Sequence, residues 1–212
     1  MSRHADTGRT AGLSPAVRIT HWVNLVAMVS MVMSGLGIYN AYPILPFHFP
    51  AWATLGGWLG GSTIWHFAAM WLLVANAAIY LGYGLLSGTL RRRLFPIRLA
   101  DGLEDLKLAL TFRLKHDGGG YNTIQKALYV GVLGAGVLMV ASGLAIWKPV
   151  QFAWLTALFG GFATARIVHF AGMSAIVAFT VVHVAMVAIV PSTLRTMTIG
   201  APRPKDGETK DE

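Results

Sequence analysis

Apolar residues are concentrated in four long stretches of the chain, at 15–39, 62–86, 122–147 and 163–190. Each stretch is long enough to cross a hydrocarbon core of about 30 Å as a helix. The pattern predicts an all-α fold, an integral membrane four-helix bundle. A fifth apolar stretch, 150–161, is too short to cross and is expected to be interfacial or re-entrant.

Local signals support the ends of these stretches. Ser14 followed by Pro15 is typical of a helix start, with an N-capping side chain and proline at the first helical position. Ser62 or Thr63 is expected to cap the second helix, and Pro191 to end the fourth. No internal sequence repeat is apparent.

The composition agrees with a membrane protein. Of the 212 residues, 55% are hydrophobic and 12% are charged, a balance too apolar for an ordinary soluble domain. Because the chain has no cysteine, disulfides, Cys-ligated zinc, iron–sulfur clusters and covalently attached c-type haem are excluded. The net charge is +8, but the positive residues flank apolar spans, so nucleic-acid binding is not expected.

Lys and Arg are distributed unevenly around the four spans. Fifteen of the seventeen lie in the N-terminal region up to Arg18, in segment 91–126, and from Arg195 onward. Only Lys148 and Arg166 fall on the other side, so the positive-inside rule places both termini in the cytoplasm. The expected organisation is a cytoplasmic tail, a four-helix domain and a second cytoplasmic tail, at 1–14, 15–192 and 193–212.

Two histidines, His169 and His183, lie fourteen residues apart within one apolar stretch. Fourteen residues are almost four helical turns, so both imidazoles face the same way, about 21 Å apart along the axis. Ionisable side chains at this depth are costly unless something compensates. A metal compensates, because neutral imidazole is a good ligand for iron.

Two further histidines are predicted to lie at the same depths in the membrane as these two. In the predicted orientation, His21 and His183 lie near the cytoplasmic face, and His66 and His169 lie near the opposite face. Each pair comes from two helices, as bis-histidine haem in a bundle requires, so the sequence predicts a bundle enclosing two b haems. Alternatively, each histidine hydrogen-bonds across helices. The remaining histidines fall in tails or loops: His4, His48 and His116.

Two arginines stand at equivalent distances from two of these histidines. Arg18 precedes His21 by three residues, and Arg166 precedes His169 by three. Each arginine is one turn nearer to water, where haem propionates would emerge and a guanidinium can bind a carboxylate bidentately. Ordinary interfacial arginines that extend toward water would give the same pattern.

Glycines recur within the spans. A flat macrocycle needs room between helices, and close helix packing in lipid produces the same enrichment. The glycines concerned are Gly35, Gly37, Gly131, Gly134, Gly136 and Gly172.

At these residues the chain resembles the bacterial di-haem cytochrome b membrane subunits of formate dehydrogenases, Ni/Fe-hydrogenases and thiosulfate-reductase-like enzymes. The resemblance covers most of the chain and rests on His21-Trp22, on His66 and on the fourteen-residue spacing of His169 and His183. It implies that His21 and His183 share the cytoplasmic-side haem, and that His66 and His169 share the periplasmic-side haem. It also implies the bacterial inner membrane and a periplasmic redox subunit, molybdenum-containing or hydrogenase-type, as partner.

The stretch 121–126 looks like the Tyr-Asn-x-x-Gln-Lys entry to the third helix of the formate dehydrogenase subunit. The resemblance implies a quinone site near Asn122, Gln125 and Lys126. These side chains would supply hydrogen-bond donors at the cytoplasmic interface, where quinone reduction also needs protons. A polar helix start capped by Asn122 is the alternative.

The predicted function is that of a membrane-anchor cytochrome b, which passes electrons between a periplasmic oxidoreductase partner and the membrane quinone pool. We expect no catalytic residues in the chain itself, with quinone as a mobile substrate. One alternative is a stand-alone superoxide:quinone oxidoreductase in which Lys148 and Arg166 guide the anion. A second is a haem-free transporter that uses the histidines as a proton or metal-ion relay.

The outer loop, 39–61, has no charged residue and carries Tyr42, Trp52 and Trp58. An uncharged aromatic surface would suit a permanent protein partner. The aromatic belt of a membrane interface explains the two tryptophans equally well.

Overall fold

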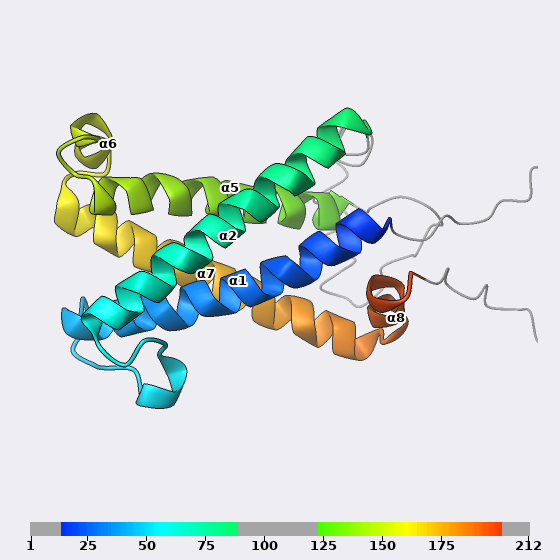
Figure 1. Ribbon diagram of the computed structural model, residues 1–212, viewed down its shortest axis with the longest axis horizontal. Coiled ribbons are helices and arrows are strands. Elements are labelled where there is room, and N and C mark those ends of the chain that lie inside the picture. Colours follow the sequence, from blue (N-terminus) through cyan, green and yellow to red (C-terminus); the bar gives the residue numbers. More distant parts are fainter. Residues whose placement is uncertain (1–13, 89–122, 201–212) are drawn as a thin grey trace, which may run out of the picture. The chain divides into compact units, whose positions relative to one another are not determined.

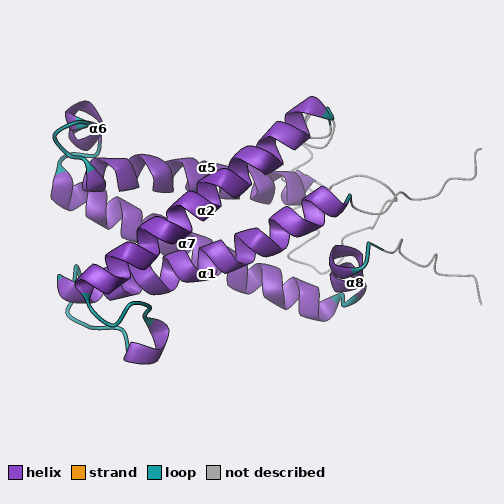
Figure 2. Ribbon diagram, in the orientation of Figure 1, coloured by secondary structure: helices purple, strands orange, loops and turns teal. Residues whose placement is uncertain are grey.

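The computed structural model describes residues 14–88 and 123–200, and every regular element within them is a helix (Figures 1 and 2). Four helices are long and apolar enough to cross a membrane, which confirms the predicted all-helical fold with four spans. They are α1 (Pro15–Ala41), α2 (Leu59–Leu86), α5 (Thr123–Trp147) and α7 (Phe162–Ile189). Three short helices are η1 (Ala51–Ala53), α6 (Ala153–Leu158) and α8 (Ser192–Thr198).

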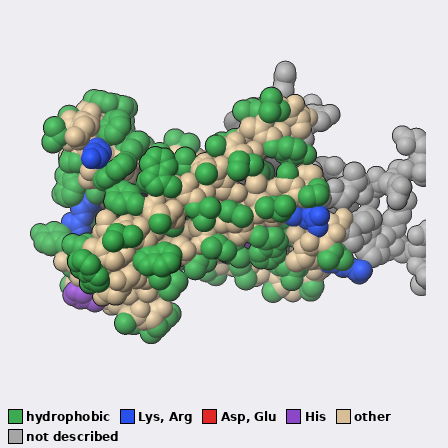
Figure 3. All heavy atoms as spheres, in the orientation of Figure 1, with side chains coloured by type: hydrophobic (Ala, Val, Ile, Leu, Met, Phe, Trp, Pro, Cys, Tyr) green, Lys and Arg blue, Asp and Glu red, His purple; other side chains and the backbone are tan. Residues whose placement is uncertain are grey.

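The surface of these helices suits lipid better than water. On the face shown in Figure 3, hydrophobic side chains cover the helical segments, and Lys and Arg side chains are seen near helix ends. All nine Asp and Glu residues fall in 1–13, 89–122 and 201–212, so the described ranges contain no carboxylate side chain. Helices of this kind satisfy their own backbone hydrogen bonds and can expose apolar side chains to a bilayer.

The start of α1 and the end of α7 agree with the sequence signals. Ser14 is the N-cap of α1, and its Oγ accepts a hydrogen bond from the backbone N–H of Val17 at 3.4 Å, with Pro15 in the first turn. Helix α7 ends at Ile189, two residues before Pro191, which becomes the N-cap of α8. The predicted interfacial segment contains α6.

The expected caps of the second helix are wrong. Helix α2 begins at Leu59, so Ser62 and Thr63 lie inside its first turns. Their hydroxyls donate to backbone carbonyls, Ser62 to Leu55 at 2.8 Å and Thr63 to Leu59 at 2.7 Å. The helix starts earlier because a turn at Gly56 and Gly57, with φ of 108° and 75°, redirects the chain just before it.

The chain divides into two compact units, each built on a helical hairpin. The first unit comprises Met1–Pro43, Phe47–Tyr80 and His183–Glu212, and the second comprises Ile44–Pro46 and Leu81–Val182. Helix α7 therefore contributes its first 21 residues to the second unit and its last seven to the first.

In the first unit, α1 and α2 run antiparallel. The Nδ2 of Asn76, a buried amide, donates to the carbonyl of Thr20 at 2.8 Å. Near the other end of α1, a Cβ added to Gly37 would collide with the Oγ of Ser62, which is 1% exposed. The absence of a side chain at Gly37 therefore lets the two helices approach closely, as small residues do in membrane proteins.

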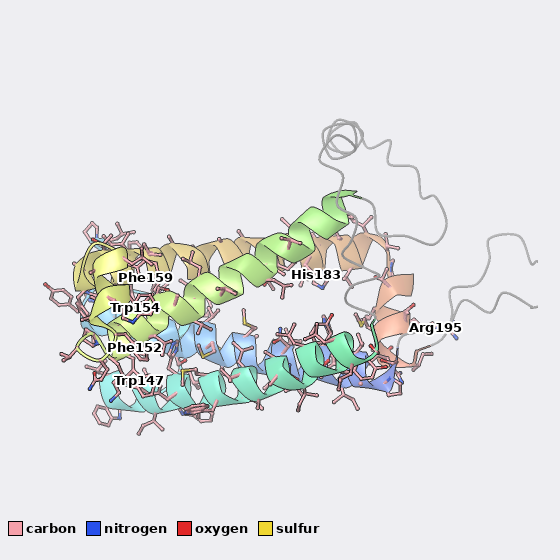
Figure 4. All side chains as sticks on the ribbon, turned by 90° about the horizontal axis from the view of Figure 1, so that it is seen from above. Trp147, Phe152, Trp154, Phe159, His183 and Arg195 are labelled. Carbon is pink, nitrogen blue, oxygen red and sulfur yellow. The ribbon has the colours of Figure 1, made fainter. Side chains whose placement is uncertain are left out.

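The second unit has an equivalent hairpin, in which α6 covers the connection between α5 and α7. Ala145 of α5 and Ala165 of α7 are fully buried and form a core with Leu155 of α6. Phe152 and Phe159 flank α6 and pack against this core (Figure 4). Small residues again stand where the two long helices meet.

The loop between α1 and α2 is anchored by one side chain. The amide of Asn40 donates its Nδ2–H to the carbonyl of Phe49 and accepts from the N–H of Phe49, both at 2.9 Å. Tyr39, Phe47 and Phe49 form an aromatic cluster beside it, with ring centroids 5.2–5.7 Å apart. Trp52 and Trp58 remain exposed.

The close approach at Gly37 gives a test of the first hairpin. Gly37→Ala should lower the free energy of unfolding by about 1–3 kcal/mol, because the methyl group overpacks the contact with Ser62. Gly82→Ala in α2 is the matched control: its Cβ would meet no heavy atom of the described residues within 4 Å, and alanine favours a helix. Thermal unfolding in detergent measures both. Equal midpoints for the two variants would contradict the packing role of Gly37.

Candidate metal-ligating histidines

His21 of α1 and His183 of α7 face each other within the first unit. Their ring centroids are 6.2 Å apart, with an angle of 61° between the ring planes. His21 also makes an edge contact with Trp22 at 5.6 Å. His21 is half-buried, whereas His183, labelled in Figure 4, is exposed in the chain by itself. The sequence predicted these two histidines as a pair, and the structure brings them together.

Helix α8 is held to α1 beside this pair. The Nη1 of Arg18 donates to the carbonyl of Thr198 at 2.8 Å, and the indole N–H of Trp22 donates to the carbonyl of Met197 at 3.3 Å. These carbonyls belong to the last turn of α8 and would otherwise lack a donor. Gly200 follows with φ of 72°, a conformation that favours glycine. The contacts tie the segment after His183 to the helix that carries His21.

The Nε of Arg18 differs from its Nη1. Its Nε is buried and has no hydrogen-bond partner among the described residues. A buried unpaired donor is costly, so this atom marks a position at which an acceptor would be stabilising.

His66 of α2 lies against Ser34 and Gly35 of α1. The Nδ1 of His66 is 3.0 Å from the Oγ of Ser34, which is fully buried. A Cβ added to Gly35 would stand 3.5 Å from the Cε1 of the same imidazole. The ring therefore packs directly on the backbone of α1. Its Nδ1 is the nitrogen that is hydrogen-bonded to Ser34.

His169 of α7 has the same surroundings in the second unit. Its Nδ1 is 2.9 Å from the Oγ of Ser142 of α5, which is also fully buried. A Cβ added to Gly143 would stand 3.3 Å from the Cε1 of His169. Two separate hairpins thus present a histidine to a Ser-Gly pair in the same way.

The common surroundings correspond to an internal repeat, so the expectation that the chain contains none is wrong. Residues 29–39 match 137–147 at seven of eleven positions, with Ser34-Gly35-Leu36 aligned to Ser142-Gly143-Leu144. Residues 62–70 match 165–173 at five of nine positions, with His66 aligned to His169. Neither serine was singled out from the sequence. The signal that could have identified them is the repeated Ser-Gly-Leu. One copy lies in the long helix before each of the two histidines, so it is found when the two helix pairs are aligned with each other.

The glycines singled out in the sequence differ in their surroundings. Gly172 serves helix packing, because a Cβ there would stand 2.8 Å from the Sδ of Met139. Gly131, Gly134 and Gly136 make no close contact, since a Cβ at each would meet no heavy atom of the described chain within 4 Å.

The remaining predicted residues are placed only in part. Arg166 lies in the first turns of α7, one turn before His169, and is half-buried. Gln125 and Lys126 lie in the first turn of α5, but their side chains are outside the described part, and Asn122 is outside the described residues altogether.

No group of three or more His, Cys, Asp or Glu side chains occurs within 14–88 and 123–200. A metal bound only by protein side chains usually takes three or four such ligands. A pair of imidazoles suits a metal whose other ligands come from elsewhere, as the four porphyrin nitrogens do in bis-histidine haem.

Comparison with known proteins agrees with this chemistry. A family model described as prokaryotic cytochrome b561 matches residues 12–200. A protein of Azospira oryzae, described as putative protein-methionine-sulfoxide reductase subunit YedZ1, is 51% identical over 187 residues, which cover 88% of this chain and 94% of that protein. No solved structure matches the chain.

Proposed function

The chain belongs to the prokaryotic cytochrome b561 family, and from this premise we propose that it is the membrane subunit of a periplasmic oxidoreductase. In this role it passes electrons between that partner and the quinone pool through two bis-histidine b haems. Membership of the family implies haem b and a multi-pass position in a bacterial membrane. The number of haems, the quinone and the partner are part of the proposal.

The observation that carries the proposal is the spacing of His21 and His183. Imidazole nitrogens bind transition metals at about 2 Å, so two imidazoles on opposite sides of one metal have ring centroids about 6 Å apart. The measured separation of 6.2 Å fits this arrangement. The rings come from different helices, and α8 holds the two helices together beside them. These residues would hold the cytoplasmic-side haem.

His66 and His169 would hold the second haem. They share one depth in the predicted orientation, they align in the internal repeat, and each has its Nδ1 beside a serine hydroxyl. In this proposal Nε2 of each ring would bind the iron. When bound, each haem would accept and release one electron at a time.

Arg18 and Arg166 would bind haem propionates. Support comes from the buried Nε of Arg18, which has no partner among the described residues. The described ranges also contain no Asp or Glu that would compete for this guanidinium. A propionate is an acceptor of the kind that this atom lacks.

The relative from Azospira oryzae suggests the partner's reaction, because it is described as a subunit of a methionine-sulfoxide reductase. Reduction of a sulfoxide to a thioether consumes two electrons and two protons and releases water. Oxidation of a quinol to a quinone supplies two electrons and two protons. Electrons would therefore flow from quinol through this chain to a partner that reduces methionine sulfoxide.

Asn122, Gln125 and Lys126 are proposed to lie at the quinone site. Gln125→Ala and Lys126→Ala should slow quinol-dependent reduction of the haems about 10-fold or more, because each removes a hydrogen-bond donor beside the quinone. Haem content should not change. Stopped-flow absorbance spectroscopy of the haems with a soluble quinol measures the rate. Wild-type rates in both variants would remove these residues from the site.

Purification of the intact protein tests the proposal against its alternatives. We expect two b haems per chain in a pyridine haemochrome assay, together with a co-purifying periplasmic redox subunit. A colourless protein would favour the haem-free transporter. Rapid haem reduction by superoxide in the isolated chain, with no partner required, would favour the stand-alone superoxide:quinone oxidoreductase.

A further inference from the structure

The hydrogen bonds at Ser34 determine which nitrogen of His66 carries the proton. The Ser34 hydroxyl lies 2.5 Å from the carbonyl of Ser30 and 3.2 Å from that of Met31, so its only proton points back into α1. Its Oγ can then only accept from the imidazole, 3.0 Å away. Nδ1 is therefore the protonated nitrogen, and Nε2 keeps its lone pair.

The same reasoning applies independently to the second unit. The Ser142 hydroxyl lies 2.7 Å from the carbonyl of Leu138 and 3.3 Å from that of Met139. Its Oγ accepts from Nδ1 of His169 at 2.9 Å. The glycine after each serine brings the imidazole close to the helix backbone, which restricts the tilt of the ring.

We propose that Ser34 and Ser142 are positioning residues for the periplasmic-side haem, each fixing the tautomer and orientation of one axial histidine so that Nε2 binds the iron. This inference rests on the proposed function of His66 and His169. Histidine ligands commonly donate their second N–H to an acceptor, and this bond raises the electron donation of the ligand. Two such bonds, one on each ligand, favour the oxidised metal and lower its reduction potential.

Ser174 makes the same bond to its own helix but has no hydrogen bond to a histidine among the described residues. Ser174 of α7 donates to the carbonyl one turn back, Phe170 at 2.9 Å, as Ser34 and Ser142 do, but it is exposed. Its substitution by alanine removes the same bond to the helix but removes no hydrogen-bond acceptor of a histidine within the described residues. Ser174→Ala is therefore the matched control.

The test compares Ser34→Ala, Ser142→Ala and the double variant with Ser174→Ala in the purified holoprotein. The readouts are haem content, the midpoint potential of each haem in a spectroelectrochemical titration, and the low-spin ferric g-values. We expect the periplasmic-side haem of each single variant to shift to a higher potential, with a larger shift in the double variant. We expect retention of that haem to weaken about 10- to 100-fold, while the other haem keeps its potential.

Conservative variants protect the test against loss of folding. Ser34→Thr and Ser142→Thr keep the hydroxyl, so we expect them to restore the wild-type potential and haem content. The inference would be overturned if the alanine variants had the same potentials as Ser174→Ala. It would also be overturned if their potentials shifted to lower values. If instead His66→Ala leaves both haems bound, the proposed ligand pair fails, and the serines fail with it.

Discussion

His183→Ala is expected to leave about half of the haem b in the purified protein and to abolish reduction by quinol. The proposed reason is that His183 supplies one of two axial ligands to the cytoplasmic-side haem, and its ring lies 6.2 Å from that of His21. Alanine leaves a single ligand on that haem. The predicted orientation assigns the proposed quinone residues to the same membrane face, so electrons from quinol would no longer enter.

The remaining haem should be partly assembled, because His66 and His169 have separate surroundings that do not involve the substituted residue. Pyridine haemochrome content and the amplitude of the reduced spectrum measure the loss. His48→Ala is the control, since His48 is exposed in the loop between α1 and α2. Retention of both haems by His183→Ala would show that the proposed pairing is wrong.

His66→Ala, His169→Ala and their double variant should each lose the same single haem. If both histidines bind one iron, removal of either ligand loses most of the binding energy, and removal of the second adds little. The expected result is therefore about one haem per chain in all three variants, with quinol still able to reduce the haem that remains. Transfer to an oxidant on the periplasmic side should stop.

Additive haem losses in the double variant would contradict this assignment. If the double variant lost two haems where each single variant lost one, His66 and His169 would serve different metals. Combination of His66→Ala with His183→Ala gives the opposite expectation, because these residues are assigned to different haems: that double variant should contain none. Metal analysis for iron, alongside the spectra, separates lost haem from misfolded protein.

The histidine positions were predictable because depth in a membrane follows from sequence spacing. A helix rises 1.5 Å per residue, so the place of His21 and His183 within their spans already assigns both to one face. Arg18 was predicted to bind a haem propionate near the interface. Its hydrogen bond to the carbonyl of Thr198 was not predicted, because 180 residues separate the two in the chain. Likewise, the position of Gly35 in the sequence does not reveal that it packs on His66.

The start of α2 was placed too late for a related reason. Ser62 and Thr63 have the composition of an N-cap, and a capping rule considers only neighbours in sequence. The structure uses their hydroxyls otherwise, since Ser62 donates to Leu55 and lies against Gly37 of another helix. A polar residue near the start of an apolar helix is equally suited to capping that helix and to a buried contact with a neighbouring helix. Only the packing distinguishes them.

The sequence by itself determined that the chain forms four long apolar helices, and it predicts two histidines at each of two depths. These properties depend on hydropathy and on the fixed rise of a helix, which are local. The tertiary structure alone decided which side chains support those histidines, because the bond between Ser34 and His66 spans 32 residues and the bond between Ser142 and His169 spans 27. Such contacts arise when helices pack, at positions where glycine or alanine permits the backbones to meet.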